Sequence, residues 1–396
     1  MPSSPELECN HTMMTGGADF VVVGAGVFGV WTAHLLRRRG HTVALIDAHG
    51  AGNARSSSGD ESRVIRMGYG GDTLYTRWAA RSLELWQEFF RATGDTLLVK
   101  TGVLWLGTDS DLYTQQLHDT LAGERIAHEK LSVPEIAARF PQIGLDRVSF
   151  GVFEPDSGVL LARRSVQAVL KDAVGSGVHY LTDAVVPPVS GGSRLEYLRT
   201  RSGKEIRGDT FIFACGAWLP QIFPEILGTR IFPTRQEVFY FRPPAGAFQF
   251  TSPAMPVWLH HEEEMYALPD IENRGVKIAS DRHGEPFDPE SGDRTVSKRS
   301  LREMRAYLRC RLPELQDSPL LDARVCQYEN TSTGDFLIDH HPEIDNAWLV
   351  GGGSGHGFKH GPAVGQYLVE RILDTTKPEG RFSIERKLQV QQRVVY

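Results

Sequence analysis

A glycine-rich turn near the N-terminus constrains the fold of this chain more than any other feature. Residues 20–23 are apolar and run directly into the sequence GAGVFG, which is followed by a segment with the apolar spacing of a helix. Gly24 permits a tight turn, Gly26 lets the backbone approach a phosphate, and Gly29 lets the helix pack closely on the strand. The N-terminus of such a helix offers N–H donors and a partial positive charge. The turn is therefore typical of a site for a nucleotide pyrophosphate.

Asp47 and the arginines at 37–39 indicate whether the segment from residue 20 onward is a nucleotide site or a membrane span. Asp47 ends an apolar stretch, at the place where the acid of a dinucleotide-binding fold accepts ribose hydroxyls. This spacing favours a dinucleotide site over a chance glycine-rich turn. A membrane span is not expected, because the apolar stretch 20–36 is too short and is broken by glycines. Arginines 37–39 fit the last turn of a helix that ends at Gly40.

Length, charge and cysteine spacing narrow the class of protein. The chain has 396 residues, enough for two lobes, and a net charge of −6 without a long basic run, so we expect no nucleic-acid partner and no membrane. The four cysteines show no CxxC spacing, which suits a reducing compartment. The histidine pairs at 260–261 and 340–341 lack the spacing of a metal site, so no metal is predicted. Residues 1–18 lack the regions of a signal peptide. We predict that they form a disordered tail and that the protein is cytoplasmic.

A second glycine-rich segment lies near the C-terminus. The strand-like stretch 348–350 runs into the sequence GGGSGHGFK, whose glycines let the backbone touch something flat or charged. A flexible loop is the alternative, but a strand and a helix are expected on either side. The apolar stretch 211–213 also ends in a glycine turn, at Gly216, which suits another close approach to a cofactor.

The remaining pattern predicts an α/β fold in two parts. Helices are expected near residues 73–92, 165–174, 297–309 and 362–373, and strands near 102–107, 178–181, 237–241, 265–268 and 276–279. We predict a discontinuous, Rossmann-like FAD-binding domain made of residues 19–95, 155–230 and 325–396. Residues 96–154 and 231–324 are expected to form an interleaved α+β substrate domain built on a mixed sheet.

Several motifs, in this order, resemble those of the sarcosine oxidase family of flavin amine oxidases, within the D-amino-acid-oxidase-like group. Besides the first turn they are RVIR at 63–66, KTGVL at 100–104, FEPDSGVL at 153–160, GAW at 216–218, RVCQY at 324–328 and SGHGFK at 354–359. The resemblance covers nearly all of the chain from Phe20 onward. It implies bound FAD, oxidation of a carbon–nitrogen single bond, reduction of O2 to H2O2, and usually a monomer.

The resemblance also implies where the cofactor binds. Cys326 matches the cysteine that carries the flavin through a thioether to its 8-methyl carbon in monomeric sarcosine oxidases, so a covalent flavin is predicted. A small buried thiol is the alternative, and Cys215 is expected to be one. The other residues expected to contact FAD lie in the two glycine-rich segments and the turns between them: Gly24, Gly26, Val27, Phe28, Gly29, Asp47, Ser58, Arg63, Gly216, Trp218, Gly353, Gly355, His356, Gly357, Phe358 and Lys359.

Cationic residues at matching positions indicate what is bound and oxidised. Arg66 and Lys359 match the pair that grips the substrate carboxylate in sarcosine oxidases, a task suited to a bidentate guanidinium and a point charge. Arg63 resembles an arginine near the flavin edge. Lys277 matches the lysine that activates oxygen, because a fixed ammonium stabilises developing superoxide. The alternative for each is a solvated surface charge.

Three further positions bear on the substrate. Tyr266 and Tyr328 match residues that frame the substrate pocket, although either ring could instead pack in the core. Asp281 departs from the pattern, because sarcosine oxidases and methyltryptophan-oxidising relatives carry a histidine four residues after the lysine, whereas fructosyl amino acid oxidases have a carboxylate there. Asp281 could receive an ammonium group or sugar hydroxyls, or be a loop acid. The resemblance therefore does not select the substrate.

The predicted reaction is the oxidation of a secondary amine or an N-substituted amino acid. The carbon next to nitrogen transfers a hydride to flavin N5, the imine hydrolyses, and O2 reoxidises the flavin. Fructosyl amino acids and cyclic imino acids of the pipecolate or proline type are alternative substrates. Two alternatives of other classes are an NAD-dependent dehydrogenase, which would not need Cys326 or the C-terminal glycines, and a catalytically silent flavoprotein.

Overall fold

The first large sheet carries the glycine-rich turn. The computed structural model describes residues 17–188 and 192–389, so residues 1–16 of the predicted tail lie outside the described residues. The central strands are parallel, and their apolar ends, such as residues 20–23 of β1 and 211–213 of β11, are buried, as expected of strands covered on both faces. Across the sheet, the order is β17 (Leu337–His340), β18 (Ala347–Gly351), β11 (Glu205–Phe213), β1 (Ala18–Val23), β2 (Val43–Asp47) and β9 (His179–Thr182), with β10 (Tyr197–Arg199) paired antiparallel to β11.

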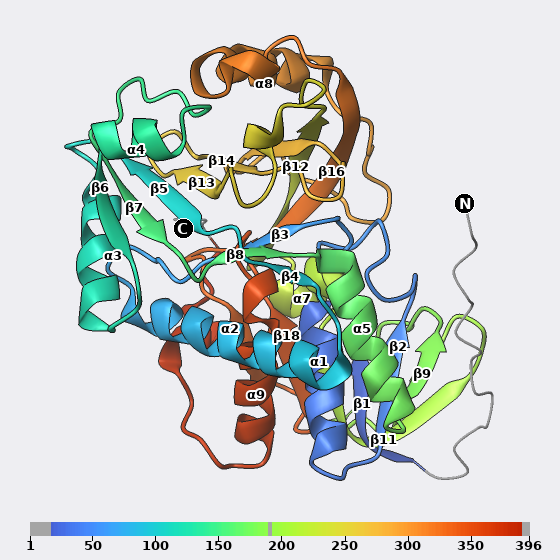
Figure 1. Ribbon diagram of the computed structural model, residues 1–396. Coiled ribbons are helices and arrows are strands. Elements are labelled where there is room, and N and C mark those ends of the chain that lie inside the picture. Colours follow the sequence, from blue (N-terminus) through green and yellow to red (C-terminus); the bar gives the residue numbers. More distant parts are fainter. Residues whose placement is uncertain (1–16, 189–191, 390–396) are drawn as a thin grey trace.

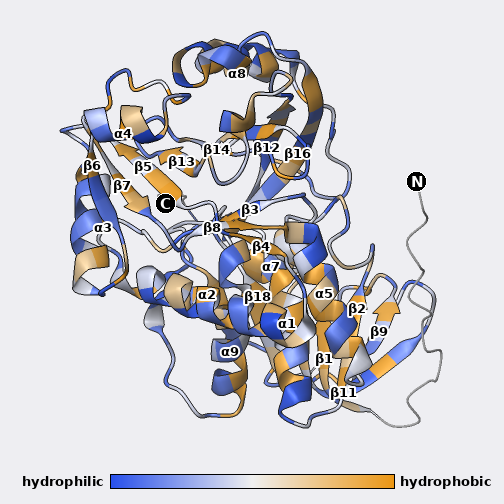
Figure 2. Cartoon of the chain, viewed as in Figure 1, coloured by the Kyte–Doolittle hydropathy of each residue, from blue (hydrophilic) through white to orange (hydrophobic). Residues whose placement is uncertain are grey.

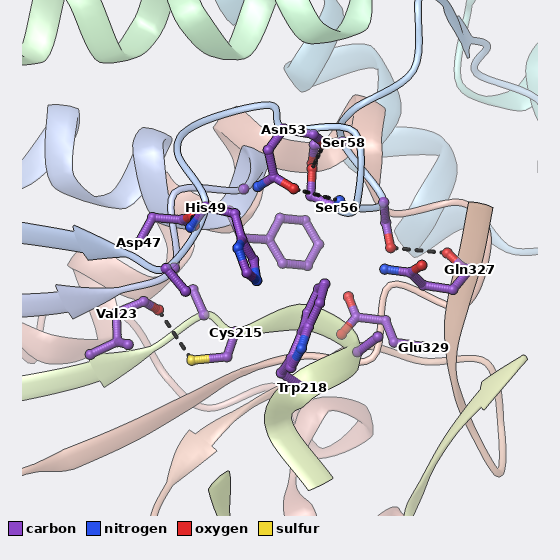
Figure 3. A pocket seen from close by; sticks show the side chains of 18 of the residues that line it. Val23, Asp47, His49, Asn53, Ser56, Ser58, Cys215, Trp218, Gln327 and Glu329 are labelled. Carbon is purple, nitrogen blue, oxygen red and sulfur yellow. Dashed lines mark hydrogen bonds between the residues drawn. The ribbon is translucent and has the colours of Figure 1, made fainter. Parts of the chain in front are cut away.

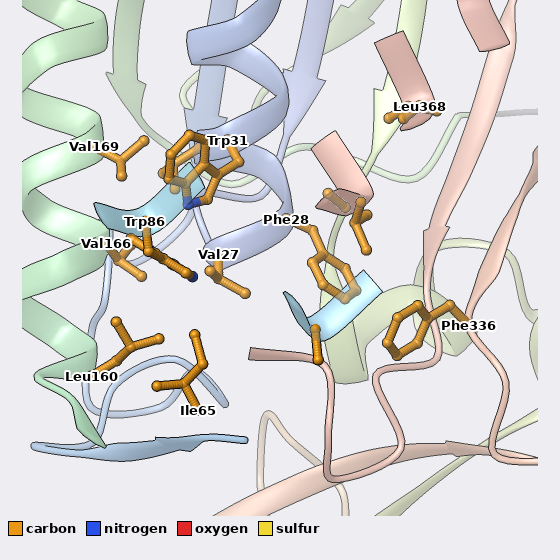
Figure 4. Close-up of a cluster of buried hydrophobic side chains, with 14 of the residues drawn as sticks. Val27, Phe28, Trp31, Ile65, Trp86, Leu160, Val166, Val169, Phe336 and Leu368 are labelled. Carbon is orange, nitrogen blue, oxygen red and sulfur yellow. The ribbon is translucent and has the colours of Figure 1, made fainter. Parts of the chain in front are cut away.

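Four helices pack together beside this sheet, in the lower half of Figure 1. Helix α1 (Val27–Arg38) lies between α5 (Ala162–Gly175) and α9 (Gly361–Ile372), and α2 (Thr73–Thr93) packs on α9. Trp31 of α1 and Trp86 of α2 meet edge to face with ring centroids 5.0 Å apart, inside the cluster drawn in Figure 4. The indole N–H of Trp86 donates to the carbonyl of Lys359 at 3.0 Å, which ties α2 to the C-terminal glycine segment.

The second large sheet forms the upper half of the molecule in Figure 1. Its strands are in the order β16 (Leu320–Thr331), β12 (Ile231–Phe241), β15 (Val276–Ser280), β14 (Met265–Leu268), β13 (Val257–His260), β5 (Val103–Gly107), β7 (Phe150–Glu154) and β6 (Glu129–Ser132). All neighbouring pairs are antiparallel except β13 and β5, so the sheet is mixed. Strands β5 and β7 stand out as hydrophobic in Figure 2.

Shorter elements complete the described part of the chain. Helices α3 (Leu112–Gly123), α4 (Val133–Arg139) and α8 (Lys298–Arg311) accompany the second sheet, while α6 (Leu219–Ile222) and α7 (Pro224–Leu227) follow β11. A small sheet of β3 (Arg63–Ile65), β8 (Gly158–Leu160) and β4 (Leu98–Val99) lies near the middle of the view in Figure 1. Among the described residues, no helix combines the length and apolar character needed to cross a membrane.

The predicted fold class is confirmed, and the predicted helices and strands are present with ends shifted by a few residues. The predicted tail extends one residue too far, because Ala18 is the first residue of β1. The predicted boundary between residues 324 and 325 is also wrong, because it cuts β16, which pairs with β12 as far as Thr331. That strand is continuous because its backbone pairs antiparallel with β12 from Leu320 to Thr331, a pairing that composition alone does not reveal. The division into domains otherwise stays a prediction.

A capping carboxylate offers a test of this architecture. Asp72 accepts hydrogen bonds from the backbone N–H groups of Leu74 and Tyr75 at the start of α2, and its two oxygens bind the Arg381 guanidinium at 3.0 and 2.6 Å. We expect Asp72→Ala to lower the free energy of unfolding by about 1–2 kcal/mol, measured by denaturant titration. Glu84→Ala, which removes only an exposed ion pair with Arg81, is the matched control and should cost less than about 0.5 kcal/mol. Equal losses for the two variants would contradict this role of Asp72.

Candidate active site

A cavity of about 420 Å³ lies where the carboxyl ends of β1, β2 and β11 meet. In a parallel sheet a ligand crevice forms at this edge, where neighbouring connections diverge. Figure 3 shows Asp47, Asn53 and Ser58 around one part of the cavity, and Cys215, Trp218 and Glu329 around another. Of the residues predicted to contact FAD, most line this cavity: Gly24, Gly26, Val27, Phe28, Asp47, Ser58, Arg63, Gly216, Trp218, Cys326, Gly353, Gly355, Gly357 and Phe358.

The first glycine turn has the close packing that the sequence predicts. Gly24 has φ +101°, and a Cβ there would lie 2.3 Å from the carbonyl oxygen of Ala214. A Cβ on Gly29 would lie 1.8 Å from the carbonyl oxygen of Gly24, so α1 can approach β1 only with glycine at this position. The hydroxyl of Ser58 accepts the N–H of Val27 at 3.1 Å. The turn is therefore held open toward the cavity.

Asp47 lies at the end of β2 and supports the turn. Its Oδ2 accepts the N–H of Ala25 at 2.7 Å, and its Oδ1 accepts the N–H of His49 at 2.8 Å. Burial raises the pKa of Asp47, while these backbone donors oppose the rise. A carboxylate has further lone pairs beyond these two bonds, so it can also accept the hydroxyls of a ribose.

The C-terminal glycine segment lines the cavity together with Glu329. The Oε1 atom of Glu329 accepts the N–H of Gly353 at 3.2 Å. Its Oε2 atom is buried and has no hydrogen-bond partner among the described residues. Burial raises the pKa of Glu329 to about 7, although backbone N–H groups favour its charged form. An unpaired acceptor at a cavity wall is typical of a group that awaits a ligand donor.

These residues fit the cofactor that the sequence resemblance implies. Glycines at both ends leave room for the backbone to approach phosphates and a flat ring. Asp47 and Glu329 offer acceptors for hydroxyl or N–H groups, and the N-terminus of α1 offers a partial positive charge. Among the described residues, no group of His, Cys, Asp and Glu side chains is arranged to hold a metal ion.

The face of the second sheet toward the cavity carries several predicted residues at alternate positions. Arg324, Cys326 and Tyr328 share one face of β16, because successive side chains of a strand point to opposite sides. On the adjoining strands, Tyr240 of β12 lies opposite Lys277 of β15. The pairing of the strands therefore gathers a thiol, two cations and two phenols on a single surface.

Cys326 lies beside a cation. The Nη2 atom of Arg63 is 3.2 Å from the Cys326 sulfur, and the same nitrogen donates to the carbonyl of Ser57 at 2.8 Å. Both Arg63 and Cys326 line the cavity. Cys215 packs against the hydrophobic core of the first sheet, as expected, and also lines the cavity, with its sulfur 3.5 Å from the carbonyl oxygen of Val23. It lies at the end of β11, where the strand opens into the glycine turn.

Arg66 is buried, so the alternative of a solvated surface charge is excluded. Its guanidinium carbon lies 4.5 Å from the centroid of the Tyr69 ring and 4.7 Å from that of Trp105, and Nη1 donates to the carbonyl of Gly68. Glu154 fixes this segment, since its carboxylate accepts the backbone N–H groups of Met67 and Gly68 and the indole N–H of Trp105.

Lys359 is buried near the same Tyr69 ring. Its Nζ lies 5.0 Å from the centroid of the Tyr69 ring and donates to the carbonyl of His356 at 3.0 Å. Burial lowers the pKa of Lys359 well below its usual value, and the positive charge of Arg66 lowers it further. Two cations that share one ring in a buried site attract an anion, which would raise the proton affinity of the lysine again.

Tyr328 and Asp281 complete this group. The Tyr328 hydroxyl donates to Oδ1 of Asp281 at 2.7 Å. The negative charge of Asp281 acts on Arg66, Lys359 and Tyr266. Burial raises the pKa of Tyr266 and of Tyr328, so both phenols stay neutral donors. Asp281 is therefore more than a loop acid: it places an acceptor close to the two cations.

Lys277 is also buried rather than solvated, with a side chain that is 2% exposed. Its Nζ lies 2.5 Å from Oδ2 of Asp60 and donates to the carbonyl of Ser62 at 2.9 Å. Lys277 does not line the large cavity. It lines a separate cavity of about 20 Å³.

Some residues that were predicted to contact FAD or substrate do not line the large cavity. Gly29, His356 and Lys359 do not line the cavity: Gly29 packs against Gly24, and His356 Nδ1 lies 3.1 Å from the Tyr69 hydroxyl. The proposed substrate residues Arg66, Tyr266 and Asp281 lie outside it as well.

Sequence reasoning missed Asp60, Glu329 and Glu154. Asp60 lies in an irregular loop, where no periodicity marks a buried position. Glu329 follows Tyr328 directly and Glu154 ends β7, so only a count of charged residues inside apolar strands could have singled them out.

Comparisons with known proteins agree with this geometry. The sequence pattern of the family described as DAO, FAD dependent oxidoreductase, matches residues 19–371. The peroxisomal sarcosine oxidase of Homo sapiens is 30% identical over 368 residues, which cover 90% of this chain and 93% of that protein. The monomeric sarcosine oxidase of Streptomyces avermitilis is 29% identical over 379 residues, 93% of this chain and 97% of that protein.

Solved structures show the same fold. L-proline dehydrogenase from P. horikoshii superposes with a TM-score of 0.83 at 21% identity, covering 94% of this chain and 98% of that chain. A thermally stable mutant of fructosyl peptide oxidase superposes with a TM-score of 0.80 at 22% identity, covering 93% of each chain. At these identities the likeness extends to the fold alone.

The contact between Gly29 and Gly24 provides a test of the cavity. A methyl group at position 29 meets backbone rather than a flexible side chain, so α1 has to move away from β1. We expect Gly29→Ala to reduce the flavin bound per chain, measured from the visible absorbance of the purified protein, and to lower the melting temperature. Gly123→Ala is the control, because a Cβ there has no neighbour within 4 Å. Parental flavin content and stability in Gly29→Ala would refute the role of this contact.

Proposed function

Because the chain belongs to the DAO family of FAD-dependent oxidoreductases, we propose that it is an oxidase of an amino acid whose nitrogen is secondary or N-substituted. The observation that carries this proposal is the pair of buried cations, Arg66 and Lys359, at the ring of Tyr69. Two cations held at one buried ring attract an anion in addition to Asp281, whose charge already acts on both. A substrate carboxylate supplies that anion.

The other side chains orient the amine. Tyr328 and Asp281 are joined by a hydrogen bond, and the negative charge of Asp281 acts on both cations. A carboxylate has several acceptor sites, so Asp281 is suited to accept a substrate N–H or hydroxyl as well. FAD, when bound, takes the hydride from the carbon next to nitrogen and passes the two electrons to O2, giving H2O2. Lys277, fixed by Asp60, supplies a positive charge for the oxygen step.

The substrate class is narrowed by the acid at position 281. Sarcosine oxidases are the relatives in sequence, and they support an N-methyl amino acid. Asp281 favours substrates with an additional donor, such as the sugar hydroxyls of fructosyl amino acids, and a fructosyl peptide oxidase shares the fold. Cyclic imino acids remain the third candidate, since a proline dehydrogenase also shares it.

The alternatives of other classes are less well supported. FAD, not a nicotinamide, is the cofactor of the family that the chain matches. A silent flavoprotein would have no need to bury Arg66, Lys359 and Lys277, each of which loses hydration in the folded chain. The predictions of H2O2 as product, a monomer and a cytoplasmic location stay predictions.

A panel of substrates tests the proposed function. Purified protein is assayed for peroxide with sarcosine, other N-methyl amino acids, pipecolate, proline and fructosyl amino acids. We expect at least one to yield peroxide, and Arg66→Lys to lower kcat/KM for it by about 10- to 100-fold, because the guanidinium fork is lost. The control is Arg77→Lys, on the exposed surface of α2, which should leave kcat/KM unchanged. No peroxide with any member, from protein that holds FAD, would contradict the proposal.

Covalent attachment of FAD at Cys326 is supported by the position of its sulfur, which lies in the wall of the large cavity and 3.2 Å from Nη2 of Arg63. We expect acid precipitation to leave the yellow colour in the pellet of the parent protein and to release it from Cys326→Ala. Cys310→Ala, which removes an exposed free cysteine, is expected to behave as the parent. Colour released from the parent itself would exclude the thioether while leaving the oxidase proposal intact.

A further inference from the structure

Asp60 is a buried carboxylate on which four side chains from separate segments converge. Its side chain is 4% exposed. Oδ2 lies 2.5 Å from Lys277 Nζ and 2.5 Å from Arg63 Nη1, while Oδ1 accepts the Tyr240 hydroxyl at 2.7 Å. Arg324 Nη1 lies 3.6 Å from the same Oδ1. Asp60 therefore joins the loop before β3 to strands β12, β15 and β16.

The two cations on Oδ2 face different spaces. Arg63 lines the large cavity and contacts the Cys326 sulfur. Lys277 lines the small cavity of about 20 Å³, together with Ser62 and Tyr240. A volume of this size holds about one water molecule, and the polar groups of Ser62, Tyr240 and Lys277 in its mixed wall offer partners for one. Lys277 can therefore exchange its proton with a water that does not enter through the large cavity.

The charges of the cluster depend on one another. Burial alone would raise the pKa of Asp60, but Lys277 and Arg63 outweigh it and hold that pKa far below its usual value. Burial lowers the pKa of Lys277 to about 8, with Asp60 raising it and Arg63 lowering it. Removing the carboxylate would leave two buried cations in mutual repulsion.

We propose that Asp60 is a positioning residue that keeps Lys277 in its ammonium form and holds the Arg63 guanidinium against Cys326. The inference rests on the proposed function, because the ammonium matters through its effect on the oxygen step. Asp60 itself touches neither substrate nor the large cavity. It acts through Lys277 and Arg63.

The groups that set the charge of Lys277 come from every element packed around it. Besides Asp60, they are Glu61 from the same loop, Arg63 at the start of β3, Tyr240 from β12, Arg324 and Cys326 from β16, and Arg164, Glu272 and Arg274 from the walls of the small cavity. Arg324 and Arg274 are paired with Glu61 at 3.1 and 3.2 Å. Asp60 is the carboxylate that contacts the ammonium directly.

The first measurement is the rate at which O2 reoxidises the enzyme-bound flavin as a function of pH, after anaerobic reduction with dithionite. In the parent, the rate is expected to fall as pH rises through about 8, because Lys277 loses its proton there. In Asp60→Asn the midpoint should move down by about 1 to 3 pH units, since an opposite charge in contact has been removed. Dithionite makes this test independent of the substrate.

The second measurement is the unfolding free energy at about pH 6 and about pH 9. The pKa of Lys277 in the fold lies below its unfolded value, so Lys277 destabilises the fold at low pH, and this cost disappears as pH rises through both values. Without Asp60 the folded value falls further and the cost at low pH grows. Asp60→Asn should therefore lose more stability, relative to the parent, at about pH 6 than at about pH 9.

Two control variants test whether the shift in the midpoint comes from the charge of Asp60 or from the loss of any nearby acid or hydrogen bond. Asp322→Asn removes an acid that binds Arg324 at 2.8 Å without touching Lys277, and it should leave the midpoint unchanged. Tyr240→Phe removes a hydrogen bond to Asp60 but no charge, and it should also leave the midpoint within about half a unit. If Asp60→Asn fails to fold, the double variant Asp60→Asn/Lys277→Met should recover folded protein, because the uncompensated ammonium is gone.

The outcomes distinguish this inference from the proposed function. An unshifted midpoint in Asp60→Asn, a stability loss equal at both pH values, or no recovery in the double variant would overturn the role of Asp60. Slow reoxidation of the parent at every pH would instead contradict the oxidase, while the stability comparison would still test the pairing of Asp60 with Lys277.

Discussion

The arrangement of the site depends on the compensation of charge buried between the two large sheets. Arg63, Arg66, Lys277 and Lys359 all lose most of their contact with water in the folded chain. Such charges are tolerated only when carboxylates, carbonyls or aromatic faces replace the lost hydration. Asp60 binds Arg63 and Lys277 directly, whereas Arg66 and Lys359 are held by carbonyls and by the ring of Tyr69.

The two clusters differ in a way that suits their proposed roles. The cluster around Asp60 contains its own counter-ion, so its positive charge is fixed in place before any ligand binds. In the cluster around Tyr69, the acid Asp281 accepts the Tyr328 hydroxyl and Lys359 donates to a backbone carbonyl, so an incoming anion adds a further partner for the two cations. The cluster around Asp60 is therefore suited to supply a permanent positive electric field, and the cluster around Tyr69 is suited to bind an anion.

The sequence predicted those parts of the structure in which a steric requirement leaves a pattern. Gly24 and Gly29 mark the turn because no side chain fits between β1, β11 and α1, and Asp47 follows at the spacing of the next parallel strand. The family resemblance is confirmed by the DAO match over residues 19–371. Most of the residues predicted to contact FAD accordingly line the large cavity, which many other residues also line, whereas the roles given to them stay predictions.

Other parts left no such pattern. Lys277 lies on β15 and Cys326 on β16. Because β15 is buried on both faces, its sequence does not show the alternation of polar and apolar residues that would mark which side chains face the site. The burial of Asp60 depends on partners that are 180 and 217 residues away in the chain, and no local pattern encodes such a contact. Glu329 and Cys215 line the cavity for the same reason: strand pairing, not local sequence, places them there.

The most direct test of the central claim is whether an amino acid carboxylate is required for reduction of the bound flavin. The protein is mixed anaerobically with matched pairs that differ in the carboxylate, such as sarcosine and dimethylamine, or pipecolate and piperidine, and loss of the yellow absorbance is followed. We expect bleaching by at least one carboxylate-bearing member and none by its partner, because Arg66 and Lys359 bind the anion. Equal bleaching by both members of a pair would show that the two buried cations do not select the substrate.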